Sequence, residues 1–274
     1  MTGPGPARSA RSGETEPEAP PPTPDPPPPT EVLADLHVHT VLSACAEVEM
    51  LPPLIVRRAL DLGLGLIGVT DHNAAANCEA VMKAAEGTGL GVLPGMEVQT
   101  SEEVHVVCLF DTVEQALAWQ GIVFNHLPDM PNPEETFGSQ LVVDANGDYI
   151  RTETRLLLTS TNLTLDDVVR RVTRLGGIAI PAHIDRPSFS LLANLGLVPS
   201  GLDSPALELF RYTPESDACR QWPELNAWPL IRSGDAHRLG EIGAGLRLSI
   251  AGKTVEELAL AFRRQGGRSF SLVV

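Results

Sequence analysis

The segment Asp35-Leu-His-Val-His-Thr40 directly follows a short apolar run, Val32-Leu-Ala34. Alternate residues of a β-strand point to the same face, so we expect His37 and His39 to lie side by side. A second segment, Thr70-Asp-His-Asn73, follows the apolar run Leu64-Gly-Leu-Ile-Gly-Val69. Imidazoles placed one strand step apart are suitable ligands for a divalent metal. The two segments therefore predict a metal site at the ends of buried strands.

Short apolar runs alternate with amphipathic stretches from residue 31 onward. They predict strands at 32–37, 66–70, 91–98, 104–110, 177–182, 206–210, 230–233 and 247–250, and helices at 52–62, 76–86, 113–118, 165–175 and 255–264. This alternation predicts parallel strand pairing, in a barrel or an open doubly wound sheet. Neither of the glycine-rich phosphate-binding motifs of nucleotide-binding folds is present, which disfavours those folds.

Two regions depart from the pattern. Residues 1–30 are rich in Pro, Gly, Ser, Glu and Ala, so we expect a disordered, Pro-rich tail, with the folded domain spanning 31–274. Residues 125–161 contain three prolines and then a predicted hairpin around Ala145-Asn-Gly-Asp148. We interpret this stretch as an insertion on the barrel rim, where loops commonly determine specificity.

Composition limits the class of protein. With 274 residues, of which 43% are hydrophobic, the chain can form a full core. No apolar run is long enough to span a bilayer, no secretory signal is evident, and the four cysteines show no CxxC spacing, so we expect a cytoplasmic protein without a membrane partner. The net charge of −15 argues against stable binding of double-stranded nucleic acid, although bound cations would restore a local attraction for phosphate.

Further polar residues interrupt or end the other apolar runs. Glu97 lies within Gly95-Met-Glu-Val98, and His105 lies within the next apolar run. His183 follows Ile180-Pro-Ala182, and Ser233-Gly-Asp-Ala-His237 follows another predicted strand. In a parallel barrel, the carboxyl ends of the strands meet at one mouth. Burying this many ionisable groups together without cations would be very costly, which again predicts bound metal.

The order of these motifs, DLHVHT, TDHN, GMEV, a strand histidine, PAH and SGDAH, resembles that of the PHP (polymerase and histidinol phosphatase) family from about residue 31 to 270. The resemblance implies an α/β fold, a distorted (β/α)7 barrel similar to a TIM barrel. It also implies two or three divalent ions (Zn, Mn or Fe) and hydrolysis of a phosphate mono- or diester by a metal-bound hydroxide. The expected substrate is a nucleotide, a short oligonucleotide or a small phosphorylated metabolite.

Carried onto this sequence, the resemblance implies a first metal held by His37, His39, Glu97 and Asp235. Glu97 would bridge to a second metal on His105 and His183, and His72 and His237 would bind a third. The third site departs from the family pattern because Ala44 cannot be a ligand. Either Cys45 or Glu49 could complete it, and a thiolate would favour zinc or iron over manganese, while Cys45 could equally be a packing residue.

Other residues are candidates for substrate binding and for orienting the ligands. Arg186 is the first candidate for a catalytic phosphate clamp, followed by Arg238 and Arg211. Asp35 and Asp71 each precede a ligand histidine, and we assign them a supporting catalytic role, orienting imidazoles.

Three alternatives remain at this stage. The first is an exonuclease, 3′-5′ or 5′-3′, that acts on short nucleic acid. The second is a non-catalytic sensor of metal or of a phosphorylated ligand. The third is amidohydrolase-like cleavage of carbon–nitrogen bonds, which would use a bridging lysine; the chain has only Lys83 and Lys253, both on predicted helices or their flanks.

Overall fold

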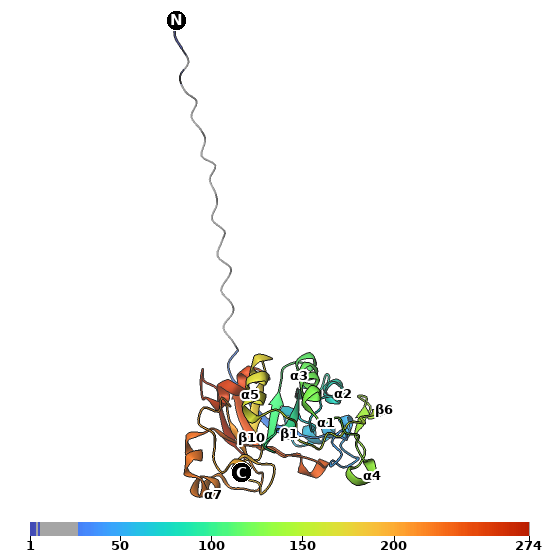
Figure 1. Ribbon diagram of the computed structural model, residues 1–274. Helices are drawn as coiled ribbons and strands as arrows, with labels where there is room; N and C mark the ends of the chain where they lie inside the picture. Colours follow the sequence, from blue (N-terminus) through green and yellow to red (C-terminus); the bar gives the residue numbers. More distant parts are fainter. Residues whose placement is uncertain (4, 6–26, 274) are drawn as a thin grey trace.

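The computed structural model describes residues 1–3, 5 and 27–273. The Pro-rich tail expected at residues 1–30 lies mostly outside this range. Within it, the chain forms an α/β structure around a curled seven-stranded sheet (Figure 1). None of the described helices is both long and apolar enough to cross a membrane.

The main sheet has the strand order β11-β10-β1-β2-β3-β4-β7. Its strands are β1 (Thr30–Val38), β2 (Leu66–Val69), β3 (Gly91–Gln99), β4 (His105–Leu109), β7 (Ile178–Pro181), β10 (Leu246–Ile250) and β11 (Ser269–Leu272). All of these except β11 were predicted from the apolar runs, with boundaries that agree to within a few residues. β11 was missed because its sequence, Ser-Phe-Ser-Leu, has only one buried position.

The expectation of parallel pairing is only partly correct. β1, β2 and β3 pair in parallel, but β4 is antiparallel to both β3 and β7. Only residues 100–104 separate β3 from β4, and a parallel crossover needs about a dozen residues or more, so β4 has to run backwards. β10 is likewise antiparallel to β1 and to β11.

A second, parallel pair of strands lies next to the sheet: β8 (Leu207–Leu209) and β9 (Leu230–Arg232). The backbone N–H of Ile184, just after β7, donates to the carbonyl of Glu208 in β8. Beyond β9, Ala236 forms a parallel bridge with Val38 at the end of β1. The β8–β9 pair is thus hydrogen-bonded to the chain at the end of β7 on one side and at the end of β1 on the other.

Helices pack around the sheet (Figure 1). They are α1 (Pro52–Asp61), α2 (Cys78–Ala84), α3 (Val113–His126), α5 (Leu165–Arg174), α6 (Leu191–Leu195), α7 (Glu215–Gln221) and α8 (Val255–Phe262), with 3₁₀ turns at Pro223–Ala227 and Leu239–Glu241. Local sequence signals explain several starts. α1 has proline in its first turn, α3 begins with a capping box of Thr112 and Gln115, and Thr164 caps α5. The short helices α6 and α7 were not predicted.

The region interpreted as an insertion contains α4 (Glu134–Phe137) and the hairpin β5 (Leu141–Val143)–β6 (Tyr149–Thr152). The predicted hairpin is therefore confirmed. The region packs on the loops that follow β1 and β2: Leu141 N–H donates to Val41, and Asn73 donates to the carbonyls of Leu157 and Thr159. These contacts hold the region against the loops that follow β1 and β2, near the candidate ligands His39 and His72.

The packing at the centre of the sheet depends on small residues. A Cβ atom at Gly95 would lie 2.1 Å from the carbonyl oxygen of Cys108, so β3 and β4 can approach this closely only with glycine there. One apolar cluster combines Ala34 and Leu36 of β1 with Leu246 and Leu248 of β10 and the buried face of α8. The sheet and α8 thereby share one apolar core.

Candidate metal centre

Glu97 is the centre of a buried cluster of imidazoles. Its Oε1 atom lies 2.9 Å from His105 Nδ1, 3.0 Å from His183 Nε2 and 3.4 Å from His37 Nε2. Its Oε2 atom lies 3.0 Å from His72 Nδ1 and 3.5 Å from His39 Nε2. All six residues are at least 93% buried. The structure therefore gathers residues that are up to 146 positions apart in the sequence around one carboxylate.

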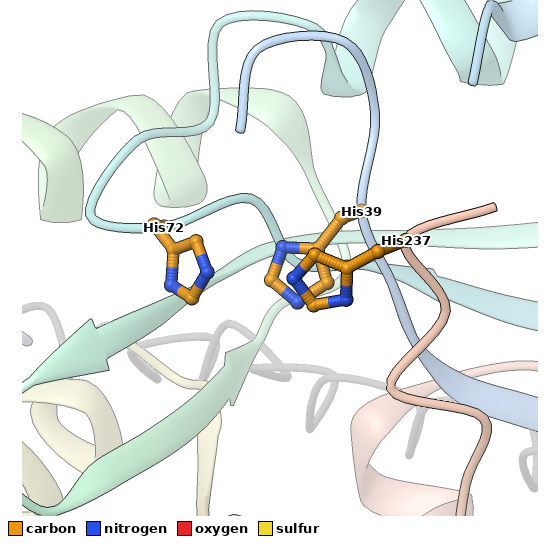
Figure 2. Close-up of side chains that lie close together, drawn as sticks. All are labelled: His39, His72 and His237. Carbon is orange, nitrogen blue, oxygen red and sulfur yellow. The ribbon is translucent and has the colours of Figure 1, made fainter. Parts of the chain in front are cut away.

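The predicted geometry of the first segment is confirmed. His37 Nε2 and His39 Nε2 face each other at 3.1 Å, so the two side chains point the same way. Asp235 Oδ1 lies 3.6 Å from each of these nitrogens. His237 lies next to His39, with the ring centroids 4.0 Å apart. Figure 2 shows the imidazoles of His39, His72 and His237 gathered from three separate segments of the chain.

His105 reaches the site by a route that the sequence analysis did not anticipate. It begins β4, whereas the other candidates end or follow their strands. Because β4 runs antiparallel to β3, its first residue pairs with Gln99 at the end of β3, on the same rim as Glu97. The reversal of β4 is thus what brings His105 to Glu97.

The spacing of several donor atoms suits coordination of a divalent cation better than hydrogen bonding between the donors. Glu97 Oε2 is buried and has no hydrogen-bond partner of acceptable geometry, although two imidazole nitrogens lie within 3.5 Å. Ligand atoms around a tetrahedral zinc ion are about 3.3 Å apart, given Zn–N bonds of about 2.0–2.1 Å. The separations of 3.4–3.6 Å from Glu97 and Asp235 to the Nε2 atoms of His37 and His39 match such a spacing and are longer than ordinary hydrogen bonds.

Three overlapping groups have ligand atoms within 4.8 Å of one another: His37-His39-Glu97, His72-Glu97-His105, and His39-His72-His237. The first and third are consistent with the sites expected from the sequence. The second differs, because His72 lies as close to Glu97 as His183 does. His72 is thus placed between the second and third groups.

The ring nitrogens of His37 and His39 that face away from the cluster are held by acceptors. Glu208 Oε1 lies 2.9 Å from His37 Nδ1, and an ionised carboxylate can only accept, so His37 presents Nε2 to the cluster. The hydroxyl of Ser43 donates to Asp71 and therefore accepts from His39 Nδ1 at 3.0 Å. Such partners fix the orientation of metal-binding imidazoles.

Glu208 and Ser43 were missed by the sequence analysis. Glu208 lies in Ala206-Leu-Glu-Leu-Phe210, and a carboxylate inside an apolar strand was the signal that would have identified it. Ser43 has no comparable signal, because a serine in a turn is common.

Asp35 and Asp71 are fully buried and do not line the cavity, which is consistent with a supporting role and not with contact to a substrate. Asp35 accepts from the backbone N–H groups of Gly234 and Gly243, and burial raises its pKa to about 6. Asp71 accepts from the backbone and hydroxyl of Thr40 and from Ser43. Both carboxylates hold ligand-bearing loops in place and touch no substrate space.

Charge and backbone strain both concentrate at this site. Burial opposes ionisation of Glu97, but the imidazoles of His105, His37 and His72 hold its pKa well below the usual range. His183 and Asp235 adopt φ values of 30° and 45°. Non-glycine residues seldom adopt positive φ, and each costs about 1–3 kcal/mol. Such strained residues are typical of functional sites.

The cluster opens into a cavity of about 600 Å³. Its lining includes Cys45, His72, His105, Asp235 and His237, and the apolar side chains of Phe137, Leu158, Phe189 and Phe210. Glu49 does not line it, and its carboxylate accepts from the N–H of Leu239. Of the two residues that could complete the third group, the structure therefore places Cys45, and not Glu49, at the cavity.

The three expected arginines also line the cavity, and each is paired. Arg186 donates to Asp235 Oδ2 at 2.9 Å, and Arg211 binds Glu241 and the Gly234 carbonyl. Arg238 is more exposed and lies near Glu47 and Glu241. Lys83 and Lys253 are exposed and lie outside the cavity, so neither can bridge metals, which argues against the amidohydrolase alternative.

Comparison with known proteins agrees with this geometry. The PHP domain model matches residues 35–194, more than half of the chain. The uncharacterized protein YqxK of Bacillus subtilis is 25% identical over 258 residues, covering 87% of this chain and 63% of that protein. The 5′-3′ exoribonuclease Rnm of Escherichia coli is 34% identical over 87 residues, covering 28% and 27% of the two chains. The chain thus spans less than two thirds of these relatives.

Solved structures support the fold. The lesion-specific endonuclease PfuEndoQ of Pyrococcus furiosus aligns with a TM-score of 0.66 at 20% identity, covering 88% of this chain and 58% of that chain. Endonuclease Q in complex with a 27-mer duplex with an abasic lesion aligns with a TM-score of 0.64, also at 20% identity, with the same coverage of both chains. Together with the match over residues 35–194, the converging histidines lead to one conclusion: the chain belongs to the PHP domain family.

Proposed function

We propose that this protein is a divalent-metal-dependent phosphoesterase that hydrolyses a phosphate ester of a nucleotide or short oligonucleotide. The observation that carries the proposal is the cluster of six imidazoles around Glu97 and Asp235, which opens into a cavity of about 600 Å³. Relatives that act on nucleic acid, Rnm and endonuclease Q, support this substrate class. On this proposal, His37, His39, His72, Glu97, His105, His183, Asp235 and His237 hold two or three metal ions (Zn, Mn or Fe), with Cys45 beside the third.

The proposed role of each residue follows from its contacts. Divalent cations bound here would polarise the phosphoryl oxygens and lower the pKa of the attacking water. Glu208 and the Ser43–Asp71 pair keep His37 and His39 oriented toward the cluster. Arg186, next to Asp235 at the cavity wall, has further N–H groups with which to bind a phosphate oxygen.

We also propose that residues 31–274 form one distorted seven-stranded barrel. The β8–β9 pair would complete it, since its two ends bond to Ile184 after β7 and to the end of β1. The β10–β11 hairpin would then lie beside β1 at the closed end of the barrel.

An exonuclease is the second candidate, favoured by the similarity of 87 residues to a 5′-3′ exoribonuclease. The expectation that double-stranded nucleic acid is not bound receives no support, because endonuclease Q was solved with a duplex. Duplex substrates therefore belong in the test alongside single strands.

The test uses purified protein loaded with manganese, zinc or iron. Mono- and diesters of nucleotides, single strands and duplexes are offered, and the released phosphate or nucleotide is measured. We expect hydrolysis that a chelator abolishes and that added metal restores, and a loss of at least about 10²-fold in His183→Ala and Glu97→Gln. His126→Ala is the matched control, because this partly exposed histidine pairs with Asn162 and does not line the cavity. Full turnover in His183→Ala would contradict the site.

A further inference from the structure

We propose that the apolar side of the cavity is a binding site for the nucleobase adjacent to the scissile phosphate, with Phe189 and Phe137 as its stacking surfaces. This inference rests on the proposed function and adds a substrate determinant to it: a base in single-stranded form, or one displaced from a duplex. Four apolar side chains line this side, and three of them are phenylalanines: Phe137, Phe189 and Phe210, with Leu158. Flat rings next to a phosphate-binding cluster suit a planar heterocycle better than an aliphatic chain.

Phe189 is held in place before any ligand binds. Its ring stacks on the His105 imidazole, with centroids 5.0 Å apart and planes 16° apart. Its carbonyl accepts from the N–H of His105, and its φ is 53°, a strained value for a residue with a Cβ atom. Even so, 38% of this large apolar residue is exposed. The chain thus holds a strained, exposed aromatic ring against a candidate metal ligand, and strain of this kind is typical of ligand-binding positions.

Phe137 reaches the cavity from the insertion. It is the last residue of α4 and is 39% exposed. The next residue, Gly138, has a φ of 94°, and a Cβ there would lie 2.8 Å from the carbonyl oxygen of Ala44. Glycine thereby lets the end of α4 lie directly on the loop that carries Cys45. This close approach places Phe137 at the rim, on the same cavity as Phe189.

The C-terminal end of the insertion, at Ser160 and Thr161, is hydrogen-bonded to the end of β3. Gln99, at the end of β3, donates its side-chain amide to Ser160 Oγ, and its carbonyl accepts from Thr161 N–H. These bonds hold the segment that contains Leu158 against the strand that carries Glu97. The cavity of about 600 Å³ lies within the range of about 300–1,000 Å³ typical of small-ligand pockets, so a base fits beside a bound phosphate.

The proposal is tested by equilibrium binding to the zinc-loaded protein. The probes are the methylene phosphonate analogues of adenosine 5′-monophosphate and ribose 5-phosphate, which resist hydrolysis and differ only in the base. Stacking contributes roughly tenfold per base, so the wild type should bind the adenosine analogue at least about tenfold more tightly. This ratio of dissociation constants should fall toward one in Phe189→Leu and in Phe137→Leu, which keep apolar bulk without a flat ring. Tyr149→Leu, an exposed aromatic residue of β6 outside the cavity, should keep the wild-type ratio.

A wild-type ratio near one, or an unchanged ratio in both phenylalanine variants, would overturn the base site. Because the readout is a ratio, a variant that merely folds poorly loses affinity for both probes and does not imitate the effect. The two variants lie on different segments, so one remains informative if the other fails to fold. If the ratio behaves as expected while no ester is hydrolysed with any metal, the base site stands and the proposed function fails.

Discussion

At the scale of single residues, the site is organised around Glu97 and the groups that orient its neighbours. Glu97 contacts five imidazoles, and Glu208 binds both the His37 ring and the backbone N–H of His183. Removing charge from Glu208 would therefore disturb two candidate ligands without touching the donor atoms themselves. This makes Glu208 a positioning residue whose effect is measurable separately from catalysis.

We predict that Glu208→Gln weakens zinc binding by about 10- to 100-fold, the usual cost of losing a partner of a ligand imidazole. The measurement is a competition titration against a chromogenic chelator. Glu215→Gln, an exposed carboxylate of α7, is the control that removes the same charge elsewhere. An unchanged zinc affinity in a folded Glu208→Gln protein would show that His37 does not depend on this contact.

The ligand candidates could be predicted from the sequence because each of them interrupts or follows an apolar run, where an ionisable group needs a partner. Their partners could not be predicted as readily. Ser43 acts through a hydroxyl relay to Asp71, and only the folding of the β1 and β2 loops onto one another brings these residues together. No sequence signal singled out Phe189 or Phe137, because only the fold brings them to the lining of one cavity.

At the scale of elements, strand ends and their connections decide which residues meet. The short connection between β3 and β4 makes β4 antiparallel to β3 and brings His105 next to Glu97. At the other end of the sheet, α8 packs against β1 and β10. The apolar pattern predicted the strands well but not their directions. Direction depends on the length of each connection and on which neighbour a strand joins, and the periodicity of a single strand does not contain that information.

α8 offers a clean test of this packing. The Arg268 side chain, just before β11, forms a bidentate ion pair with Glu257 of α8, and Glu257 also accepts from the N–H of Ala251. The hydrogen bonds from Arg268 lower the pKa of Glu257 below its ordinary value of 4.5. This carboxylate therefore binds fewer protons in the folded state than in the unfolded chain at acidic pH.

We predict that Glu257→Gln lowers the free energy of unfolding by about 1 kcal/mol at pH 7, the usual contribution of one charge-assisted pair. A depressed folded pKa means that this contribution is fully present above the unfolded value near 4.5 and is lost as the pH falls through the folded value. The difference between wild type and variant should thus shrink below about pH 4 in urea unfolding. Glu256→Gln, on the exposed side of the same turn, should show no such difference.

At the scale of the whole molecule, the protein carries a formal charge of −15, yet three arginines line one cavity. Among the described residues, the Arg and Lys side chains that line this cavity are Arg186, Arg211 and Arg238. The α/β class and the charge were accessible from the sequence. The proposed substrate class was not, since the residues that line the cavity come from segments far apart in the sequence.

This charge distribution predicts a weak dependence on salt. Three phosphate contacts give a slope of about −2 in a plot of log K against log salt concentration for single strands. Binding of an oligonucleotide should therefore fall by no more than about 20-fold between 50 and 200 mM salt, measured by fluorescence anisotropy on the metal-loaded protein. A fall of about 10³-fold or more would indicate an extended basic surface that the charge distribution does not provide.

The most direct test of the central claim is anomalous diffraction at the zinc edge from crystals of the zinc-loaded protein. We predict at least two peaks within bonding distance of the side chains around Glu97, one of which also lies within bonding distance of His37 and His39. A cavity without any peak, in crystals that bind zinc only at the surface, would contradict the assignment of this histidine cluster as the metal centre.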